Sequence, residues 1–402
     1  MFLSFKISNY RSIGKEITID FGIRDSQRLG AFAEVNNQVI NNIGCLVGPN
    51  AGGKSNILKG IVQFLDWAHK SYSSSTYRSA NLITHFSCKD SPIEFSTEFI
   101  DQNNQYKYEV SILHNMVQNE ILQIRNENTK RYSYIFDRKT DKNVSFSKIK
   151  KINQQDLYRL GDDMSLLSLM LELNYFDKND FLTIRNFHDN VYPEMIYIEQ
   201  HPDWKLDFIS SHLQYNNILF DELIEELKNI DTGISSLEII KRREKVKLPN
   251  SGEIVGEREQ ATILAKHTVA NINFTLSMME ESSGTLHYIE TFIHLSKVLQ
   301  NGGLFIADEL EQSLHPDLTS RIINRFMNKD KNPNNAQLLF TTHNPWFLQD
   351  LTKTQIFITE KNEEAQTEIT RLDEVAGVRN DENYFMKYIA GEYDGRPKIK
   401  ET

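Results

Sequence analysis

The sequence contains little cysteine and no long apolar run. Only Cys45 and Cys88 occur among its 402 residues, and neither belongs to a Cys/His cluster of the kind that binds zinc. No segment approaches the roughly 20 consecutive apolar residues that span a bilayer. The opening residues also lack the basic and apolar regions of a signal peptide. We therefore expect a cytoplasmic protein with no membrane contact.

The chain also lacks a positive charge excess. It has 45 Lys+Arg against 55 Asp+Glu and a formal net charge of -10, whereas proteins that bind nucleic acid non-specifically have the opposite balance. Residues 241–247 form a local basic run that could still contact nucleic acid, and Lys148, Lys150 and Lys151 are a weaker candidate. Such runs are more often solvated. DNA contact therefore stays an open question.

The most informative segment that is present reads GPNAGGKS and occupies residues 48–55, called the phosphate loop below. It matches G-x-x-x-x-G-K-[ST] between a predicted buried strand, residues 43–47, and a predicted helix from residue 56. In that context Lys54 contacts the β- and γ-phosphates and Ser55 ligates Mg²⁺. A chance match is the alternative, and the flanking strand and helix count against it. The predicted ATP-binding residues are Gly48, Asn50, Ala51, Gly52, Gly53, Lys54, Ser55 and Asn56.

Two adjacent carboxylates, Asp308 and Glu309, follow the apolar residues 304–307. We expect this run to be a central parallel strand that ends at the catalytic edge of a sheet. Asp308 would then hold the Mg²⁺ that Ser55 also ligates, and Glu309 would orient or deprotonate the attacking water. Acidic residues at a strand end are also common as ordinary solvated groups. The phosphate loop upstream favours the catalytic interpretation.

Two further segments indicate the class of ATPase. One is Ser282, Ser283 and Gly284, called the hydroxyl-glycine segment below, which precedes a predicted helix over residues 286–299. It places two hydroxyls and free N–H groups at a helix N-terminus, where an anion can bind. The other is His343, which comes soon after a predicted strand and can contact a γ-phosphate there.

The order of these motifs resembles the ABC-type ATPase head found in SMC, RecF and OLD proteins. The resemblance implies an α/β fold, in which a mixed sheet is flanked by helices and accompanied by an antiparallel β-subdomain and a helical insertion. It also implies that the hydroxyl-glycine segment completes the nucleotide site of the opposite subunit, so that ATP is sandwiched in a homodimer or higher oligomer.

The N-terminus agrees with this resemblance. Residues 2–8 and 16–21 alternate like two strands, and Asn-Tyr-Arg lies between them at positions 9–11. Opening strands that end in this way are frequent in RecF-like and SMC-like heads, where the arginine approaches the nucleotide. Arg11 is therefore either a nucleotide contact or an ordinary surface cation.

The distance between motifs predicts an insertion. Lys54 and Ser282 are 228 positions apart (282 minus 54), too far for a transporter-type ATP subunit with its compact helical subdomain. Residues 1–147 are predicted to be the N-terminal lobe of the head, with a β-meander after residue 90. Residues 148–230 are predicted to be a helical insertion that lacks the heptads of a long coiled coil. Residues 231–402 are predicted to be the C-terminal lobe.

Over most of its length the chain resembles the RloA/AbiLi-type ATP-binding proteins, small OLD-like and RecF-like ATPases of bacterial defence loci. Outside the head motifs the resemblance is carried by Ser165-Leu166-Leu167-Ser168-Leu169, Leu314-His315-Pro316, Asp381-Glu382-Asn383 and Tyr393-Asp394-Gly395. Such proteins act with a separately encoded effector, often a nuclease, during abortive infection by phage. The resemblance therefore implies an effector partner and a phage-derived trigger.

One departure from the OLD nucleases matters. Only 59 residues follow His343 (402 minus 343), which is too few for the Toprim nuclease domain of those proteins. The acidic pairs Asp373-Glu374 and Asp381-Glu382 are therefore expected to be solvated charges of the tail.

Two other functions compete. A RecF-like or SMC-like DNA repair or recombination ATPase would act directly on DNA, and the acidic charge balance counts against it while the Asn-Tyr-Arg start counts for it. The energy subunit of a membrane transporter is disfavoured by the insertion and by the lack of an evident coupling surface.

Overall fold

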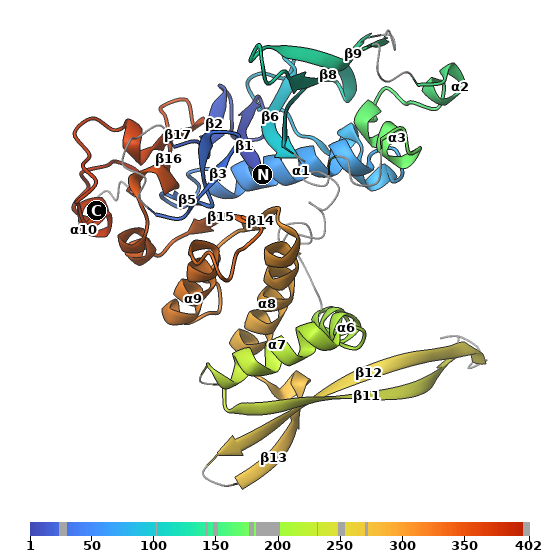
Figure 1. Ribbon diagram of the computed structural model, residues 1–402, viewed down its shortest axis with the longest axis vertical. Helices are drawn as coiled ribbons and strands as arrows, with labels where there is room; N and C mark the ends of the chain where they lie inside the picture. Colours follow the sequence, from blue (N-terminus) through green and yellow to red (C-terminus); the bar gives the residue numbers. More distant parts are fainter. Residues whose placement is uncertain are drawn as a thin grey trace. The chain divides into compact units, whose positions relative to one another are not determined.

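A computed structural model describes residues 1–23, 30–101, 103–140, 144–147, 152–176, 181, 202–230, 232–247, 254–269 and 272–396. The chain forms two compact units (Figure 1). The first comprises Met1–Val191, Val298–Leu310 and Ile323–Thr402, and the second comprises Tyr192–Lys297 and Glu311–Ile322. In its described part, no helix combines the length and apolarity that crossing a membrane requires.

The first unit contains a seven-stranded antiparallel sheet in the order β10-β9-β8-β7-β6-β1-β2. Its strands are β1 (Phe2–Ser8), β2 (Ile17–Asp20), β6 (Ile93–Asp101), β7 (Asn104–Leu113), β8 (Met116–Arg125), β9 (Tyr132–Lys139) and β10 (Val144–Phe146). Burial alternates along β1, where Phe5 and Ile7 are buried and Lys6 is exposed, because neighbouring side chains point to opposite faces. The predicted N-terminal strands and β-meander are confirmed, and the β1–β6 pairing joins them in one sheet.

The second sheet of this unit has five strands in the order β14-β15-β5-β16-β17. They are β5 (Ile43–Val47), β14 (Leu304–Ala307), β15 (Gln337–Thr342), β16 (Ile356–Lys361) and β17 (Thr367–Arg371). The first four run parallel and β17 is antiparallel. Every residue of β5, β14 and β15 is buried, which explains their continuous apolar character. The prediction that residues 304–307 form a central strand was wrong, because among the described strands β14 lies at one edge.

Helix α1 (Lys54–Lys70) follows β5 and packs on the seven-stranded sheet (Figure 1). Phe64 stacks on Phe95 of β6 with ring centroids 5.0 Å apart. A Cβ at Gly60 would lie 3.0 Å from Ile7 of β1, so glycine permits this close approach. The phosphate loop is thereby attached, through α1, to the antiparallel sheet.

The remaining elements of the first unit are short. They are β3 (Phe32–Val35), β4 (Gln38–Asn41), α2 (Gln154–Leu157), α3 (Leu166–Glu172), α10 (Tyr384–Ala390) and the 3-10 helices η1 (Ser75–Tyr77), η2 (Ser79–Asn81), η6 (Pro345–Asp350), η7 (Lys353–Gln355) and η8 (Leu372–Glu374). Two of the unit boundaries fall within longer helices, α8 (Ser283–Asn301) and α9 (Pro316–Met327).

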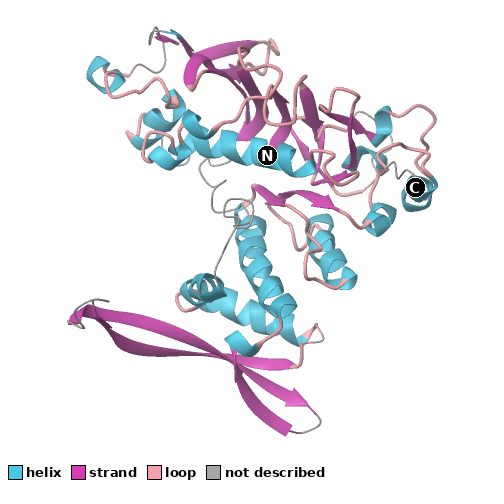
Figure 2. Ribbon diagram, turned by 180° about the vertical axis from the view of Figure 1, so that it is seen from behind, coloured by secondary structure: helices cyan, strands magenta, loops and turns pink. Residues whose placement is uncertain are grey.

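The second unit pairs helices with a separate three-stranded antiparallel sheet, β11-β12-β13. Its further elements are α6 (Pro202–Leu213), α7 (Asn217–Lys228), β11 (Ile234–Lys247), β12 (Ile254–Val269), β13 (Ile272–Ser277) and η5 (Met278–Glu280). Strands β11 and β12 form a long twisted ribbon (Figure 2). Leu219, Leu223 and Leu227 recur every four residues on the buried side of α7, which packs on β11.

Helices α3 and α7 lie within residues 148–230, where the sequence predicts a helical insertion. Residues 231–402 are predicted to be the C-terminal lobe, yet β11, β12 and β13 group with α6 and α7. Lys148, Lys150 and Lys151 lie outside the described residues. The three predicted domain ranges stay a prediction.

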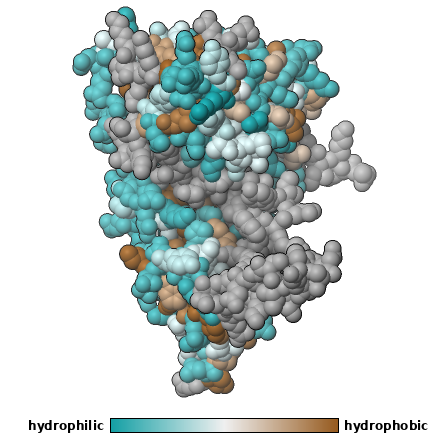
Figure 3. All heavy atoms as spheres, turned by 90° about the vertical axis from the view of Figure 1, so that its right-hand side faces the viewer, coloured by the Kyte–Doolittle hydropathy of each residue, from teal (hydrophilic) through white to brown (hydrophobic). Residues whose placement is uncertain are grey.

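Hydrophilic side chains cover most of the described surface on the face shown in Figure 3, and hydrophobic side chains appear there only in small separate groups. Scattered apolar side chains of this kind are normal on a folded protein. That face therefore offers no broad apolar docking surface in its described part.

Candidate nucleotide site

Three motif-bearing strands of the first unit end at the same edge of the five-stranded sheet. Strands β14, β15 and β5 are neighbours in this order and run parallel, so their carboxyl ends meet at one edge. Strand β5 leads into the phosphate loop, β14 into Asp308 and Glu309, and β15 into His343. Segments that are widely separated in the sequence are thus neighbours in the fold.

The phosphate loop has the form of an anion cradle. Gly53 caps α1 in the left-handed conformation, with φ of 104°, and makes no side-chain cap bond; the first turn of α1 has no acidic residue. The first N–H groups of α1 are therefore not covered by a capping side chain. Lys54 is only 5% exposed, and its Nζ donates to the carbonyl oxygens of Gly48 at 2.8 Å and Pro49 at 3.1 Å. Its ammonium thus lies within the curve of the loop.

Thr341 of β15 fixes the acidic pair. Its hydroxyl donates to Asp308 Oδ1 at 2.6 Å and accepts from the Glu309 N–H at 2.7 Å. Glu309 has a φ of 50°, an uncommon conformation for a residue with a side chain. His343 Nε2 lies 3.2 Å from Glu309 Oε1, and the two side chains are 40% and 46% exposed. The two predicted catalytic residues therefore touch each other and are accessible.

Arg11 is connected to α1 by hydrogen bonds through the hydroxyl of Tyr10. Its Nε donates to the Tyr10 hydroxyl at 2.8 Å, and this hydroxyl donates to Gln63 of α1 at 2.7 Å. Burial raises the pKa of Tyr10, and the charge of Arg11 partly offsets the effect. Lys361, whose pKa burial lowers, donates to the carbonyl of Ser12 at 3.4 Å. Two cations thus flank the turn between β1 and β2.

Sequence reasoning missed Ser12 and Thr367, which link this turn to the phosphate loop. Their hydroxyls are 2.8 Å apart, and Asn56 Nδ2 donates to Ser12 Oγ at 2.7 Å. A Cβ at Gly53 would lie 2.0 Å from Thr367 Oγ1, so Thr367 packs directly on the loop. The Asn56 amide therefore supports the turn in this structure. No local pattern signals Thr367, because it reaches the loop from a strand more than 300 positions away.

The hydroxyl-glycine segment lies at the start of α8 in the second unit. Ser282 Oγ accepts from the Thr285 N–H at 3.1 Å and caps the helix. Ser282 and Ser283 are exposed. A Cβ at Gly284 would lie 2.6 Å from the carbonyl oxygen of Ser313, which explains why a glycine is needed there. The predicted contact of this segment with a second subunit stays a prediction.

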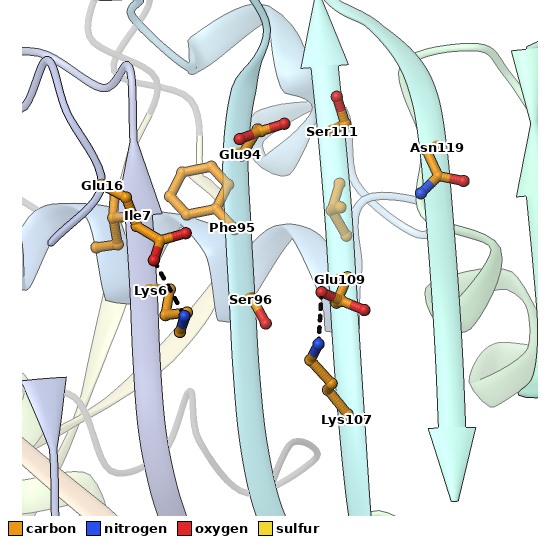
Figure 4. Close-up of a pocket in the computed structure, with 11 residues that line it drawn as sticks. Lys6, Ile7, Glu16, Glu94, Phe95, Ser96, Lys107, Glu109, Ser111 and Asn119 are labelled. Atoms are coloured by element: carbon orange, nitrogen blue, oxygen red, sulfur yellow. Dashed lines mark hydrogen bonds and ion pairs between the residues drawn. The ribbon is translucent and has the colours of Figure 1, made fainter. Parts of the chain in front are cut away.

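A hollow on the seven-stranded sheet is separate from this site (Figure 4). It encloses about 240 Å³, and its two lysines are paired, Lys6 with Glu16 at 3.0 Å and Lys107 with Glu109 at 2.8 Å. Glu94 accepts from a serine hydroxyl. Because its cations are already matched by carboxylates, the hollow is a poor match for a nucleotide.

A phosphate loop between a parallel strand and a helix, with an acidic pair and a histidine on the neighbouring strands, defines a P-loop NTPase of the α/β class. The antiparallel sheet and the insertion are the two additions that the sequence resemblance to an ABC-type ATPase head predicts. The chain belongs to the family described as "AAA domain, putative AbiEii toxin, Type IV TA system", whose model matches residues 43–348.

Solved structures with a similar chain include three SMC heads, each with 12% sequence identity over 92% of this chain. One is the SmcHead bound to the C-winged helix domain of ScpA, in which the match covers 96% of that chain with a TM-score of 0.48. Another is the SMC head domain from Thermotoga maritima, covered to 98% with a TM-score of 0.37. The third is the Smc head domain with an extended coiled coil bound to the C-terminal domain of ScpA, derived from Pyrococcus furiosus, covered to 95% with a TM-score of 0.43. No curated protein matches the chain.

Proposed function

We propose that the protein binds ATP and Mg²⁺ at the phosphate loop and hydrolyses the ATP with Glu309 as the residue that orients or deprotonates water. The observation that carries this proposal is the junction at Thr341, whose hydroxyl bonds the Asp308 carboxylate and the backbone N–H of Glu309 to the strand that leads to His343. Glu309 and His343 are within hydrogen-bond distance, so the histidine orients the carboxylate or contacts the γ-phosphate.

The residues at this edge fit a magnesium nucleotide. The Ser55 hydroxyl and the Asp308 carboxylate supply oxygen ligands, which Mg²⁺ prefers. When bound, Mg²⁺ neutralises charge on the phosphate oxygens. Lys54 contributes the fixed positive charge, and the start of α1 contributes N–H donors. Arg11 approaches the nucleotide from the turn after β1.

The proposed catalytic unit is a homodimer or a higher oligomer. Ser282 and Ser283 are exposed at the start of α8, and the first turn of this helix has no acidic residue. An exposed helix N-terminus with two hydroxyls suits the phosphates of another subunit. We therefore assign the hydroxyl-glycine segment to the nucleotide bound by the second copy, so that ATP closes the dimer and hydrolysis opens it.

We further propose that this cycle holds or releases a separately encoded effector, a nuclease or toxin, during abortive infection in the bacterial cytoplasm, in response to a phage-derived trigger. The support is the resemblance to RloA/AbiLi-type proteins and the description of the matching family, which names a toxin of a toxin–antitoxin system.

Direct action on DNA is less favoured by the second unit. The basic run of β11 is paired with β12 in a register that places Arg243 opposite Glu259, Glu244 opposite Arg258 and Lys245 opposite Glu257. The paired segments therefore carry residues of both charge signs, which lowers their net positive charge. A mobility shift of duplex DNA at physiological salt tests this point, and tight binding would favour the DNA repair function.

The dimer proposal is tested by mixing two inactive variants, Ser283→Arg and Lys54→Ala. In a mixed dimer one composite site carries both changes and the other carries neither, by the symmetry of an isologous pair. We expect each variant alone to lack ATPase activity and the mixture to recover up to roughly one working site per mixed dimer. Ser283→Arg alone should keep its ATP affinity.

Subunit exchange is verified by co-purification of differently tagged copies. If the subunits exchange and activity does not recover, either the two sites must turn over together or the hydroxyl-glycine segment acts within its own subunit. Loss of ATP affinity in Ser283→Arg would then place the segment at the nucleotide of its own subunit.

A further inference from the structure

Glu226 of α7 connects the insertion, by which we mean from here on α7 with β11–β13, to two helices of the second unit. This carboxylate is 5% exposed and accepts from the Tyr288 hydroxyl of α8. It also accepts twice from Arg321 of α9, through Nε at 2.6 Å and Nη2 at 3.0 Å. These hydrogen bonds raise the pKa of Arg321, as expected for a guanidinium held by a carboxylate. One carboxylate therefore joins α7, α8 and α9.

Both partners of Glu226 lie close to the hydroxyl-glycine segment. Tyr288 comes four residues after Gly284, on the same face of α8 one turn later. The carbonyl of Ser313, shortly before α9, approaches Gly284 so closely that a Cβ there would lie 2.6 Å from it. A shift of α7 that moves Glu226 would therefore displace the elements that hold Gly284.

The insertion reaches the segment from its other side as well. His267 of β12 lies 2.7 Å from Glu281, the residue before Ser282, and both side chains are 7% exposed. The His267 ring stacks on Phe274 of β13, with centroids 4.9 Å apart. Residues on both sides of the hydroxyl-glycine segment are thus bonded to the insertion.

A buried carboxylate is a costly way to hold three helices together. Its desolvation is offset only when its oxygens are satisfied with good geometry, and well-packed apolar residues can stabilise a fold equally well. Hydrogen bonds differ from apolar packing because they fix the relative position of the groups that they join. The hydrogen bonds of Glu226 are therefore suited to setting the position of α7 relative to α8 and α9.

We propose that Glu226 is a positioning residue that transmits movement of the insertion, α7 with β11–β13, to the hydroxyl-glycine segment and thereby sets the rate of ATP turnover on the second copy. This inference rests on the proposed cross-subunit site. Binding of a partner to the insertion would act on hydrolysis by this route, without a contact to the nucleotide.

The test uses Glu226→Gln in the full-length chain, with Glu225→Gln as the matched control. Glu225 is the preceding residue of α7, and its 69% exposed side chain bonds Lys228 at the surface. We expect Glu226→Gln to keep its affinity for a fluorescent ATP analogue and to lower kcat roughly tenfold, within the range of such couplings. Glu225→Gln should match the unmodified protein in both measurements.

The decisive readout is a mixture of Glu226→Gln with Lys54→Ala. If Glu226 acts through the hydroxyl-glycine segment, one composite site of the mixed dimer is intact and kcat per mixed dimer rises above that of either variant. A residue with a merely structural effect, or one acting on the nucleotide of its own subunit, gives no recovery. Where Glu226→Gln fails to fold, as judged by its thermal melting curve, Tyr288→Phe replaces it because it removes one hydrogen bond and keeps the ring.

Two failures are distinguishable. If the Ser283→Arg mixture recovers and the Glu226→Gln mixture does not, the positioning function is wrong and the cross-subunit site stands. If neither mixture recovers although subunits exchange, and Ser283→Arg has also lost its ATP affinity, the cross-subunit site itself is wrong and this inference falls with it. An unchanged kcat in Glu226→Gln also overturns the inference.

Discussion

The acidic pair of the first unit and the hydroxyl-glycine segment of the second unit are held in different ways. Asp308 and Glu309 are fixed by a neutral hydroxyl, Thr341, from the neighbouring strand of the same sheet. The hydroxyl-glycine segment is fixed from the insertion, by His267 on one side and by Glu226 on the other. One half of the proposed composite site is thus built into the catalytic sheet, and the other half depends on elements outside it.

This difference suggests that the sheet edge supplies a fixed catalytic geometry and that the insertion supplies a movable one. Thr341 ends a strand that the neighbouring strands of the sheet hold in place, so we expect its bonds to keep the acidic pair in one arrangement. Helices joined by side-chain bonds can adopt more than one arrangement when a partner binds. We therefore expect substitutions at the sheet edge to act directly on ATP affinity or on the chemical step. Substitutions in the insertion should lower kcat by a smaller factor.

The largest effect is expected for Glu309→Gln. The amide keeps the volume of the side chain and can still bond His343, but it cannot accept a proton from water. We expect kcat to fall roughly 100- to 10,000-fold, the range for loss of a general base, while ATP still binds and a closed dimer accumulates. Light scattering with and without ATP measures the dimer, and steady-state kinetics measures kcat. A variant with normal turnover would show that another group activates the water.

Lys54→Ala should act on binding rather than on chemistry. It removes the buried ammonium that lies within the phosphate loop, and a hydrogen bond to a charged group contributes about 1.5–3 kcal/mol. We expect ATP affinity to fall about 100-fold, as measured by titration with a fluorescent nucleotide. Lys59→Ala, on the same helix, is the control. Undiminished affinity in Lys54→Ala would refute the assignment of the nucleotide site.

The contrast between the two units also explains which parts of the site can be predicted from the sequence. The phosphate loop, the acidic pair and the strands before them are contiguous patterns, and each can be recognised locally. Thr341 lies at the end of the strand that precedes His343, but its bond to Asp308 follows only from the order β14-β15-β5. Glu226 gave no signal, since it looks like any other acid on a helix until its partners 62 and 95 positions away are known.

The same limit applies to β11, β12 and β13. Alternating apolar and polar residues can indicate a strand, but they do not tell which sheet the strand joins. That they pair only with each other, among the described strands, depends on long-range packing. The functions of the individual site residues remain predictions.

Thr341→Val tests whether the sheet edge has a single arrangement. Valine keeps the shape of the side chain and removes the hydroxyl that bonds Asp308 and Glu309, so we expect kcat to fall about tenfold through misplacement of the acidic pair. Thr342→Val is the matched control, because the Thr342 hydroxyl bonds the backbone of Asn344, to whose carbonyl it donates at 3.2 Å and from whose N–H it accepts at 2.9 Å. If both variants lower kcat equally, the strand end rather than the bond matters.

The smallest effect is expected at His267, where two variants separate the hydrogen bond from ring stacking. His267→Phe keeps a ring against Phe274 and loses the bond to Glu281, whereas His267→Gln keeps a donor and loses the ring. Loss of this bond leaves the buried Glu281 acceptor unsatisfied, at a cost of about 1–3 kcal/mol in stability. Because Glu226 still holds α8 from the other side, we expect only part of this cost to appear as misplacement of the hydroxyl-glycine segment. We expect kcat to fall roughly threefold to fivefold in His267→Phe, to change less in His267→Gln, and ATP affinity to be unchanged in both. The reverse order in the steady-state kinetics would mean that stacking of β12 on β13, and not the bond to Glu281, sets the position of the hydroxyl-glycine segment.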